Sequence, residues 1–214
     1  MARVSRQAGS PSLKQAYTDE ARRLASRSMT GLAQTRLTPT ALTVSGLALC
    51  IVGSVVVHFP YRNELLYFWL GAAIFLVGSI LDILDGALAR AGGKATPFGA
   101  FIDSTTDRIG EAFMLGSIGL VFARDGNEVA LAFAFAAVAG SFLVSYTRAR
   151  AEALGLKGDV GIGSRAERVI VITVGLAIAP WGGLQWAIYL LAATTWVTVI
   201  QRIWSVRSQL RARG

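Results

Sequence analysis

The chain has 214 residues, of which 53% are hydrophobic and only 16% are charged. A mean hydropathy of +0.51 is too apolar for a soluble domain of this length, so the composition predicts an integral membrane protein. Lys and Arg exceed Asp and Glu by 21 to 13, giving a net charge of +8. We interpret this excess as a signal of topology and of contact with anionic lipid headgroups, and we expect no nucleic-acid partner. The single cysteine, Cys50, excludes an intrachain disulfide.

The first expected element is a basic amphipathic helix at residues 12–34, lying in the membrane interface beside the membrane domain. Three apolar residues share one face of this helix: Leu13, Tyr17 and Leu24. A partly disordered basic tail is the alternative. We therefore expect residues 1–36 to form a cytoplasmic basic tail and residues 37–214 to form the membrane domain.

Apolar stretches long enough to cross a bilayer as a helix, about 20 residues each, recur along the rest of the chain. The expected spans are residues 39–59, 66–89, 98–122, 128–147, 168–180 and 184–204. The fold class predicted from the sequence is thus an all-α integral membrane protein with six transmembrane helices.

Basic residues predict the orientation of these spans. They gather before the first span, between the second and third, between the fourth and fifth, and after the sixth, whereas the opposite loops hold only Arg62 and Arg124. Because Lys and Arg favour the cytoplasmic side, we expect both termini to be cytoplasmic and the protein to lie in the plasma membrane.

Four aspartates form a frame at the expected cytoplasmic ends of the second and third spans. It reads Asp82-x2-Asp85-Gly86-x2-Ala89-Arg90, then eight residues, then Gly99-x3-Asp103-x3-Asp107. Spacings of three and four place each acid pair on one helix face, and the Gly- and Pro-containing turn at 91–97 folds the two helices together. An ionised carboxylate at membrane depth costs about 2.5–3.5 kcal/mol, so such acids indicate a functional site.

Four clustered carboxylates require a cation, and hard divalent metals prefer carboxylate oxygens. Metal pairs also recur where phosphoryl groups are transferred. Any single acid of the frame could be a buried structural residue, but packing alone does not explain four acids in register with an arginine. Glu111, one turn beyond the frame, is interpreted as structural rather than metal-binding.

The frame resembles the signature of the CDP-alcohol phosphotransferases, D-x2-D-G-x2-A-R-x8-G-x3-D-x3-D, at every fixed position. The resemblance implies a homodimer, a CDP-linked lipid donor, release of CMP, and two Mg²⁺ ions with Mn²⁺ as the alternative. It assigns the metals to Asp82, Asp85, Asp103 and Asp107, and it makes Asp107 the catalytic base as well. It places the CDP-lipid among Thr40, Ala41, Leu42, Thr43, Gly86, Arg90 and Thr96.

A second resemblance concerns the acceptor. Residues 145–153 (SYTRARAEA), 155–159 (GLKGD) and 165–168 (RAER) are similar to the actinobacterial phosphatidylinositol phosphate synthases. It implies inositol phosphate as acceptor, 1D-myo-inositol 3-phosphate in that group. Arginine forks suit a phosphate ester, and the residues assigned to this role are Arg148, Arg168 and Arg202.

The sequence therefore predicts transfer of a phosphatidyl group from CDP-diacylglycerol to inositol phosphate. One alternative is glycerol-3-phosphate as acceptor, which would give phosphatidylglycerol phosphate. Another is a divalent-cation or proton-coupled transporter, since transporters also use buried carboxylates. A transporter would carry its acids near the membrane midplane, whereas these lie beside an expected cytoplasmic loop next to Arg90.

Overall fold

The computed structural model describes residues 39–59, 63–91, 93 and 95–213. The amphipathic helix expected at 12–34, and with it the tail 1–36, lies outside the described residues. The described part is all-helical, as predicted. Its elements are α2 (Pro39–Val57), α3 (Glu64–Ala91), α4 (Pro97–Arg124), α5 (Glu128–Ala153), α6 (Arg165–Ala177), the short 3-10 helix η2 (Ala179–Trp181) and α7 (Leu184–Arg211).

In the described part, four helices are long and apolar enough to cross a membrane: Thr40–Val57, Glu64–Gly86, Glu128–Ala153 and Leu184–Arg211. The protein is thus a multi-pass membrane protein. The remaining two expected spans are helical as α4 and α6. However, α4 carries acids in its first half, and the 13 residues of α6 reach about 20 Å against a hydrocarbon core of about 30 Å. The count of six spans stays a prediction.

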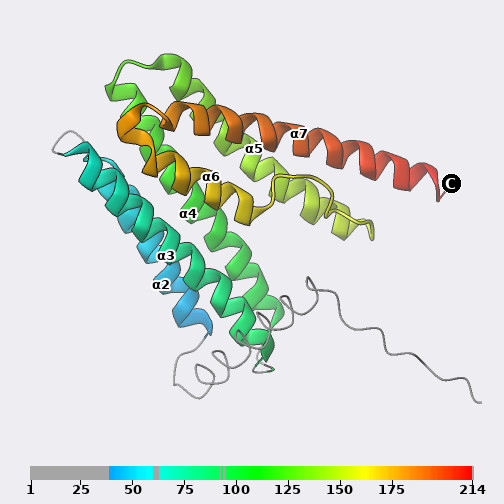
Figure 1. The fold of residues 1–214 in the computed structure, drawn as a ribbon. Coiled ribbons are helices and arrows are strands. Elements are labelled where there is room, and N and C mark those ends of the chain that lie inside the picture. Colours follow the sequence, from blue (N-terminus) through cyan, green and yellow to red (C-terminus); the bar gives the residue numbers. More distant parts are fainter. Residues whose placement is uncertain (1–38, 60–62, 92, 94, 214) are drawn as a thin grey trace, which may run out of the picture.

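The helices form two groups, one of α2, α3 and α4 and the other of α5, α6 and α7 (Figure 1). Helices α2, α3 and α4 contact one another, and α5 packs along α7. Helix α6 contacts both α3 and α7, and α4 contacts α5. A shared core of fully buried side chains links the two groups, including Phe75, Met114, Ile118, Ile172 and Ile188. This arrangement brings the start of α6 against the end of α3 and the start of α4.

Glycines let α2 and α3 approach at backbone distance. A Cβ atom added to Gly78 would lie 2.7 Å from the carbonyl oxygen of Gly46, and one added to Gly46 would lie 2.8 Å from that of Gly78. One heptad along, an added Cβ on Gly53 would lie 3.1 Å from the carbonyl oxygen of Gly71. Such close approach is typical of small residues at membrane helix interfaces. It sets the distance between the first turns of α2 and the last turns of α3.

Two helix caps fix where the site-bearing helices begin. The hydroxyl of Thr96 accepts from the N–H of Gly99, and Pro97 opens α4 at a position where no N–H is needed. Ser164 and Glu167 form a capping box at the start of α6. The two caps place Asp103 and Arg165 within the first two turns of their helices.

Candidate active site

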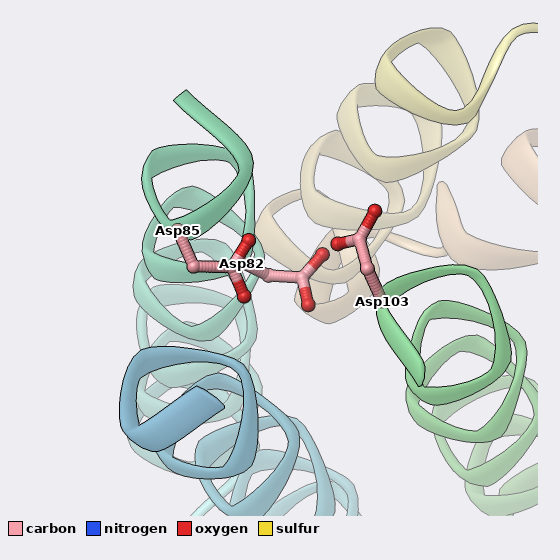
Figure 2. A group of neighbouring side chains, drawn as sticks. All are labelled: Asp82, Asp85 and Asp103. Atoms are coloured by element: carbon pink, nitrogen blue, oxygen red, sulfur yellow. The ribbon is translucent and has the colours of Figure 1, made fainter. Parts of the chain in front are cut away.

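Three of the four frame aspartates converge between α3 and α4. Asp82 and Asp85 lie near the end of α3, and Asp103 points toward them from the start of α4 (Figure 2). One carboxylate oxygen of each lies within 4.8 Å of the others. Asp82 and Asp85 are only 4% and 2% exposed. The convergence follows from the i,i+3 spacing on α3 and from the turn that leads into α4.

These carboxylates fit a divalent metal ion. Their oxygens are hard ligands, and they are gathered closely enough for one ion to contact all three. The Oδ1 atom of Asp85 is buried and accepts no hydrogen bond from the described residues. A buried carboxylate oxygen without a donor is costly unless a cation contacts it. The donor set thus supports a metal at this position.

Thr43 holds one of these carboxylates. Its hydroxyl, on α2, donates a short hydrogen bond to Oδ2 of Asp85, and both side chains are buried. The family resemblance assigned Thr43 to the CDP-lipid and gave it no contact with an aspartate. The side-chain role depends on the close approach of α2 and α3, which no local pattern reports.

Asp107, the fourth aspartate of the frame, forms an ion pair with Arg165 on α6. Its Oδ1 atom lies 2.7 Å from Nη2 of Arg165, and Nη1 of the same guanidinium forms a shorter ion pair with Asp82. Arg165 is the first residue of α6, so it reaches the frame from outside α3 and α4. Sequence reasoning missed Arg165, because it is one of several basic residues around a loop and nothing nearby indicates its acidic partners.

A pocket of about 260 Å³ opens beside the aspartates. Of the seven residues that the resemblance assigned to the CDP-lipid, four line this pocket together with Asp85 and Asp103: Thr40, Thr43, Gly86 and Thr96. Ala41 is exposed and Leu42 is buried, and neither side chain lines the pocket. The side chain of Arg90 lies outside the described residues.

Two of the three expected acceptor arginines are engaged within the protein. Arg168 is 5% exposed and donates to both carboxylate oxygens of Glu111, at 2.7 and 2.8 Å, and to the carbonyl of Gly163 at 2.8 Å. Arg202 is 6% exposed and donates to the carbonyls of Val160, at 2.9 Å, and Val144. These contacts secure the loop at 154–164.

Arg148 differs from these two because its side chain is exposed. Its Nε atom lies 2.9 Å from a carboxylate oxygen of Glu152, one turn along α5. An exposed i,i+4 pair of this kind contributes at most a few tenths of a kcal/mol, roughly 0.3–0.5. The guanidinium of Arg148 can therefore exchange this partner for a ligand at little cost.

Residues 36–209 match the family model of the CDP-alcohol phosphatidyltransferases. The chain is 38% identical over 181 residues to the archaetidylinositol phosphate synthase of Pyrococcus horikoshii, covering 84% of this chain and 88% of that one. It is 35% identical over 180 residues to the phosphatidylinositol phosphate synthase of Mycolicibacterium smegmatis, covering 80% and 78%.

Solved structures of a phosphatidylinositol phosphate synthase from Mycobacterium tuberculosis have the same fold. The structure with bound CDP-DAG superposes with a TM-score of 0.74 at 28% identity, covering 86% of this chain and 94% of that one. The structure in complex with manganese and citrate gives a TM-score of 0.74 at 29% identity, covering 85% and 88%.

Proposed function

Since the chain belongs to the CDP-alcohol phosphatidyltransferase family, we propose that it transfers a phosphatidyl group from CDP-diacylglycerol to inositol phosphate and releases CMP. The observation that carries this proposal is the complete aspartate frame, three of whose acids converge beside a pocket large enough for part of a nucleotide. Inositol phosphate as the acceptor is supported by two relatives, which are named archaetidylinositol phosphate synthase and phosphatidylinositol phosphate synthase. The match covers 88% and 78% of their lengths.

The reaction is a displacement at phosphorus. A hydroxyl of inositol phosphate attacks the lipid-side phosphate of the donor, a new phosphorus–oxygen bond forms, and the bond to the bridging oxygen breaks so that CMP leaves with the electron pair. We assign Asp107 as the base that accepts the hydroxyl proton. A divalent pair held by Asp82, Asp85, Asp103 and Asp107, Mg²⁺ or alternatively Mn²⁺, would supply positive charge against the diphosphate.

We assign the pocket beside the aspartates to the CDP part of the donor. The first turn of α2, residues 40–43, directs backbone N–H groups toward this end of the helix, where anionic groups are favoured. Thr40, Gly86 and Thr96 line the same pocket. Arg90 follows Gly86 by about one helical turn, and we propose that it contacts the diphosphate or nucleotide.

We assign the acceptor to the arginines around the loop at 154–164. Arg148 is accessible there, and Arg168 and Arg202 approach the loop from α6 and α7. A guanidinium has more N–H donors than the contacts described above use. Arg168 and Arg202 can therefore hold the loop, and Arg148 can pair with Glu152, while each still has an N–H group to donate to a phosphate.

We further propose that both termini and the aspartates face the cytoplasm, in six spans, and that the protein acts as a homodimer in the plasma membrane. The distribution of basic residues supports this orientation.

The aspartate frame is tested by substitution. In bilayers containing CDP-diacylglycerol and supplied with Mn²⁺ and inositol phosphate, we expect Asp82→Asn, Asp85→Asn and Asp103→Asn each to lower CMP release by about 10²-fold or more. A chelator should also abolish it, and Mg²⁺ or Mn²⁺ should restore it. Asp125→Asn is the matched control, because Asp125 is exposed beyond the far end of α4. Near wild-type turnover for any frame variant removes that residue from the metal site.

A further inference from the structure

Arg165 contacts two of the acids that the proposed reaction assigns to metal binding. Its guanidinium bridges Asp82 on α3 and Asp107 on α4. The paired oxygens are Oδ2 of Asp82 and Oδ1 of Asp107, and neither accepts a hydrogen bond from the described residues besides this ion pair. A guanidinium that holds both oxygens competes with a metal ion for the same carboxylates, because two cations close together repel each other strongly where water is scarce.

A second ion pair lies one turn further along both helices. Glu111 follows Asp107 by four residues on α4, and Arg168 follows Arg165 by three residues on α6, so the Asp107–Arg165 and Glu111–Arg168 ion pairs lie one turn apart between the same two helices. The Glu111–Arg168 pair has two hydrogen bonds, and its side chains are only 8% and 5% exposed. Arg165, by contrast, is 26% exposed and is the first residue of α6.

The Asp107–Arg165 and Glu111–Arg168 ion pairs differ in how easily they separate. Separating Glu111 from Arg168 would leave two buried charges unpaired, which is strongly unfavourable. The guanidinium of Arg165 can turn toward solvent at the helix end and recover hydration there. The Glu111–Arg168 pair therefore keeps α6 in contact with α4, while Asp82 and Asp107 can exchange Arg165 for another cation.

We propose that Arg165 is a positioning residue that serves as an exchangeable counter-ion of the aspartate cluster. It pairs with Asp82 and Asp107 while no metal is bound, and it leaves them when a divalent cation takes the carboxylates. Full ionisation of four carboxylates needs more positive charge than one guanidinium provides, whereas a pair of divalent ions would balance it and make Arg165 surplus. This inference rests on the metal site of the proposed function.

Metal binding without substrate tests the proposal. The Mn²⁺ affinity of the purified full-length protein is measured in bilayers from the electron paramagnetic resonance signal of free Mn²⁺. Arg165→Gln removes the competing cation, so it should bind Mn²⁺ about ten-fold more tightly than the wild type. The same variant should melt at a lower temperature than the wild type in a chelator, and at the same temperature in saturating Mn²⁺. Arg207→Gln, an exposed position on α7, should match the wild type throughout.

Arginine modification tests the same exchange in the unsubstituted protein. Phenylglyoxal labelling followed by peptide mass spectrometry should find Arg165 protected in a chelator and labelled in Mn²⁺, with Arg168 protected and Arg207 labelled in both. An unchanged or weaker Mn²⁺ affinity for Arg165→Gln, a melting difference that persists in saturating Mn²⁺, or protection of Arg165 in both states overturns the proposal. A wild-type protein that binds no Mn²⁺ contradicts the proposed metal site itself.

Discussion

The hydrogen bond from Thr43 to Asp85 helps to orient a buried carboxylate. Replacing Thr43 by Val keeps the shape and removes the donor. A hydrogen bond to a charged group contributes about 1.5–3 kcal/mol, which corresponds to roughly ten- to a hundred-fold in an equilibrium constant. We expect Thr43→Val to raise the Mn²⁺ concentration needed for half-maximal CMP release by that factor.

Thr43→Ser is the matched variant, because it retains the hydroxyl on a smaller side chain. It should need nearly the wild-type concentration of Mn²⁺. Equal metal dependence for the Val and Ser variants would show that the hydroxyl does not orient the ligand.

Arg168 has a structural role through its ion pair with Glu111, in addition to the acceptor binding that we propose. Because Glu111 is buried beside it, Arg168→Met should leave an unpaired buried carboxylate and cost about 3–5 kcal/mol of stability. The double variant Glu111→Leu, Arg168→Met removes both charges and should recover most of that loss. Thermal unfolding in bilayers or detergent measures both effects.

The double variant also separates the two roles of Arg168. If Arg168 binds inositol phosphate as we propose, the double variant should be stable yet have a raised KM for inositol phosphate and an unchanged KM for CDP-diacylglycerol. A stable double variant with wild-type kinetics would remove Arg168 from the acceptor site. An undiminished stability of Arg168→Met alone would contradict the importance of the ion pair.

Among the elements, α2 and α3 are in such close contact that no further methyl group fits between their backbones. A methyl group on Gly78 would sit 2.7 Å from a backbone oxygen of α2, and overpacking of this kind typically costs about 1–3 kcal/mol. We expect Gly78→Ala to lower the melting temperature and to reduce activity, because the separation of the helices sets the Thr43–Asp85 contact. Gly116→Ala is the control, since an added Cβ there meets nothing within 4 Å. Equal melting temperatures for the two variants would contradict this account of the interface.

The apolar runs were sufficient to locate these elements but not to place their ends. The expected span at 98–122 corresponds to α4, Pro97–Arg124, and the span at 168–180 corresponds to α6, Arg165–Ala177. The shift in α6 arises from the capping box at Ser164, which starts the helix before its apolar residues begin. An apolar window detects only the part of a helix that faces lipid or core, and so it overlooks polar first turns.

Helical spacing was also sufficient to bring Asp82, Asp85 and Asp103 together, because each spacing acts within one helix or across one turn. It could not predict the partner of Asp107. The pairing with Arg165 joins residues 58 positions apart, and it depends on how α6 docks against α3 and α4. Long-range pairs between charged side chains follow from tertiary packing, which has no signature in a local pattern.

At the scale of the whole molecule, the two helix groups bring two kinds of chemistry to one end. The group formed by α2, α3 and α4 holds the aspartates and the pocket. The group formed by α5, α6 and α7 holds Arg148, Arg165, Arg168 and Arg202. Arg165 links the two groups directly. A donor carrying a diphosphate and an acceptor carrying a phosphate could thus approach from opposite sides of the same carboxylates.

The identity of the acceptor is the central claim, and a comparison of three acceptors tests it most directly. The purified protein in bilayers with CDP-diacylglycerol and Mn²⁺ would receive inositol phosphate, glycerol-3-phosphate or free inositol, and CMP and the lipid product would be quantified. We predict rapid formation of phosphatidylinositol phosphate from inositol phosphate, and slower reaction of free inositol by roughly ten-fold or more because it lacks the charge that arginines bind. Product from glycerol-3-phosphate alone, or equal use of free inositol, would contradict the assigned acceptor.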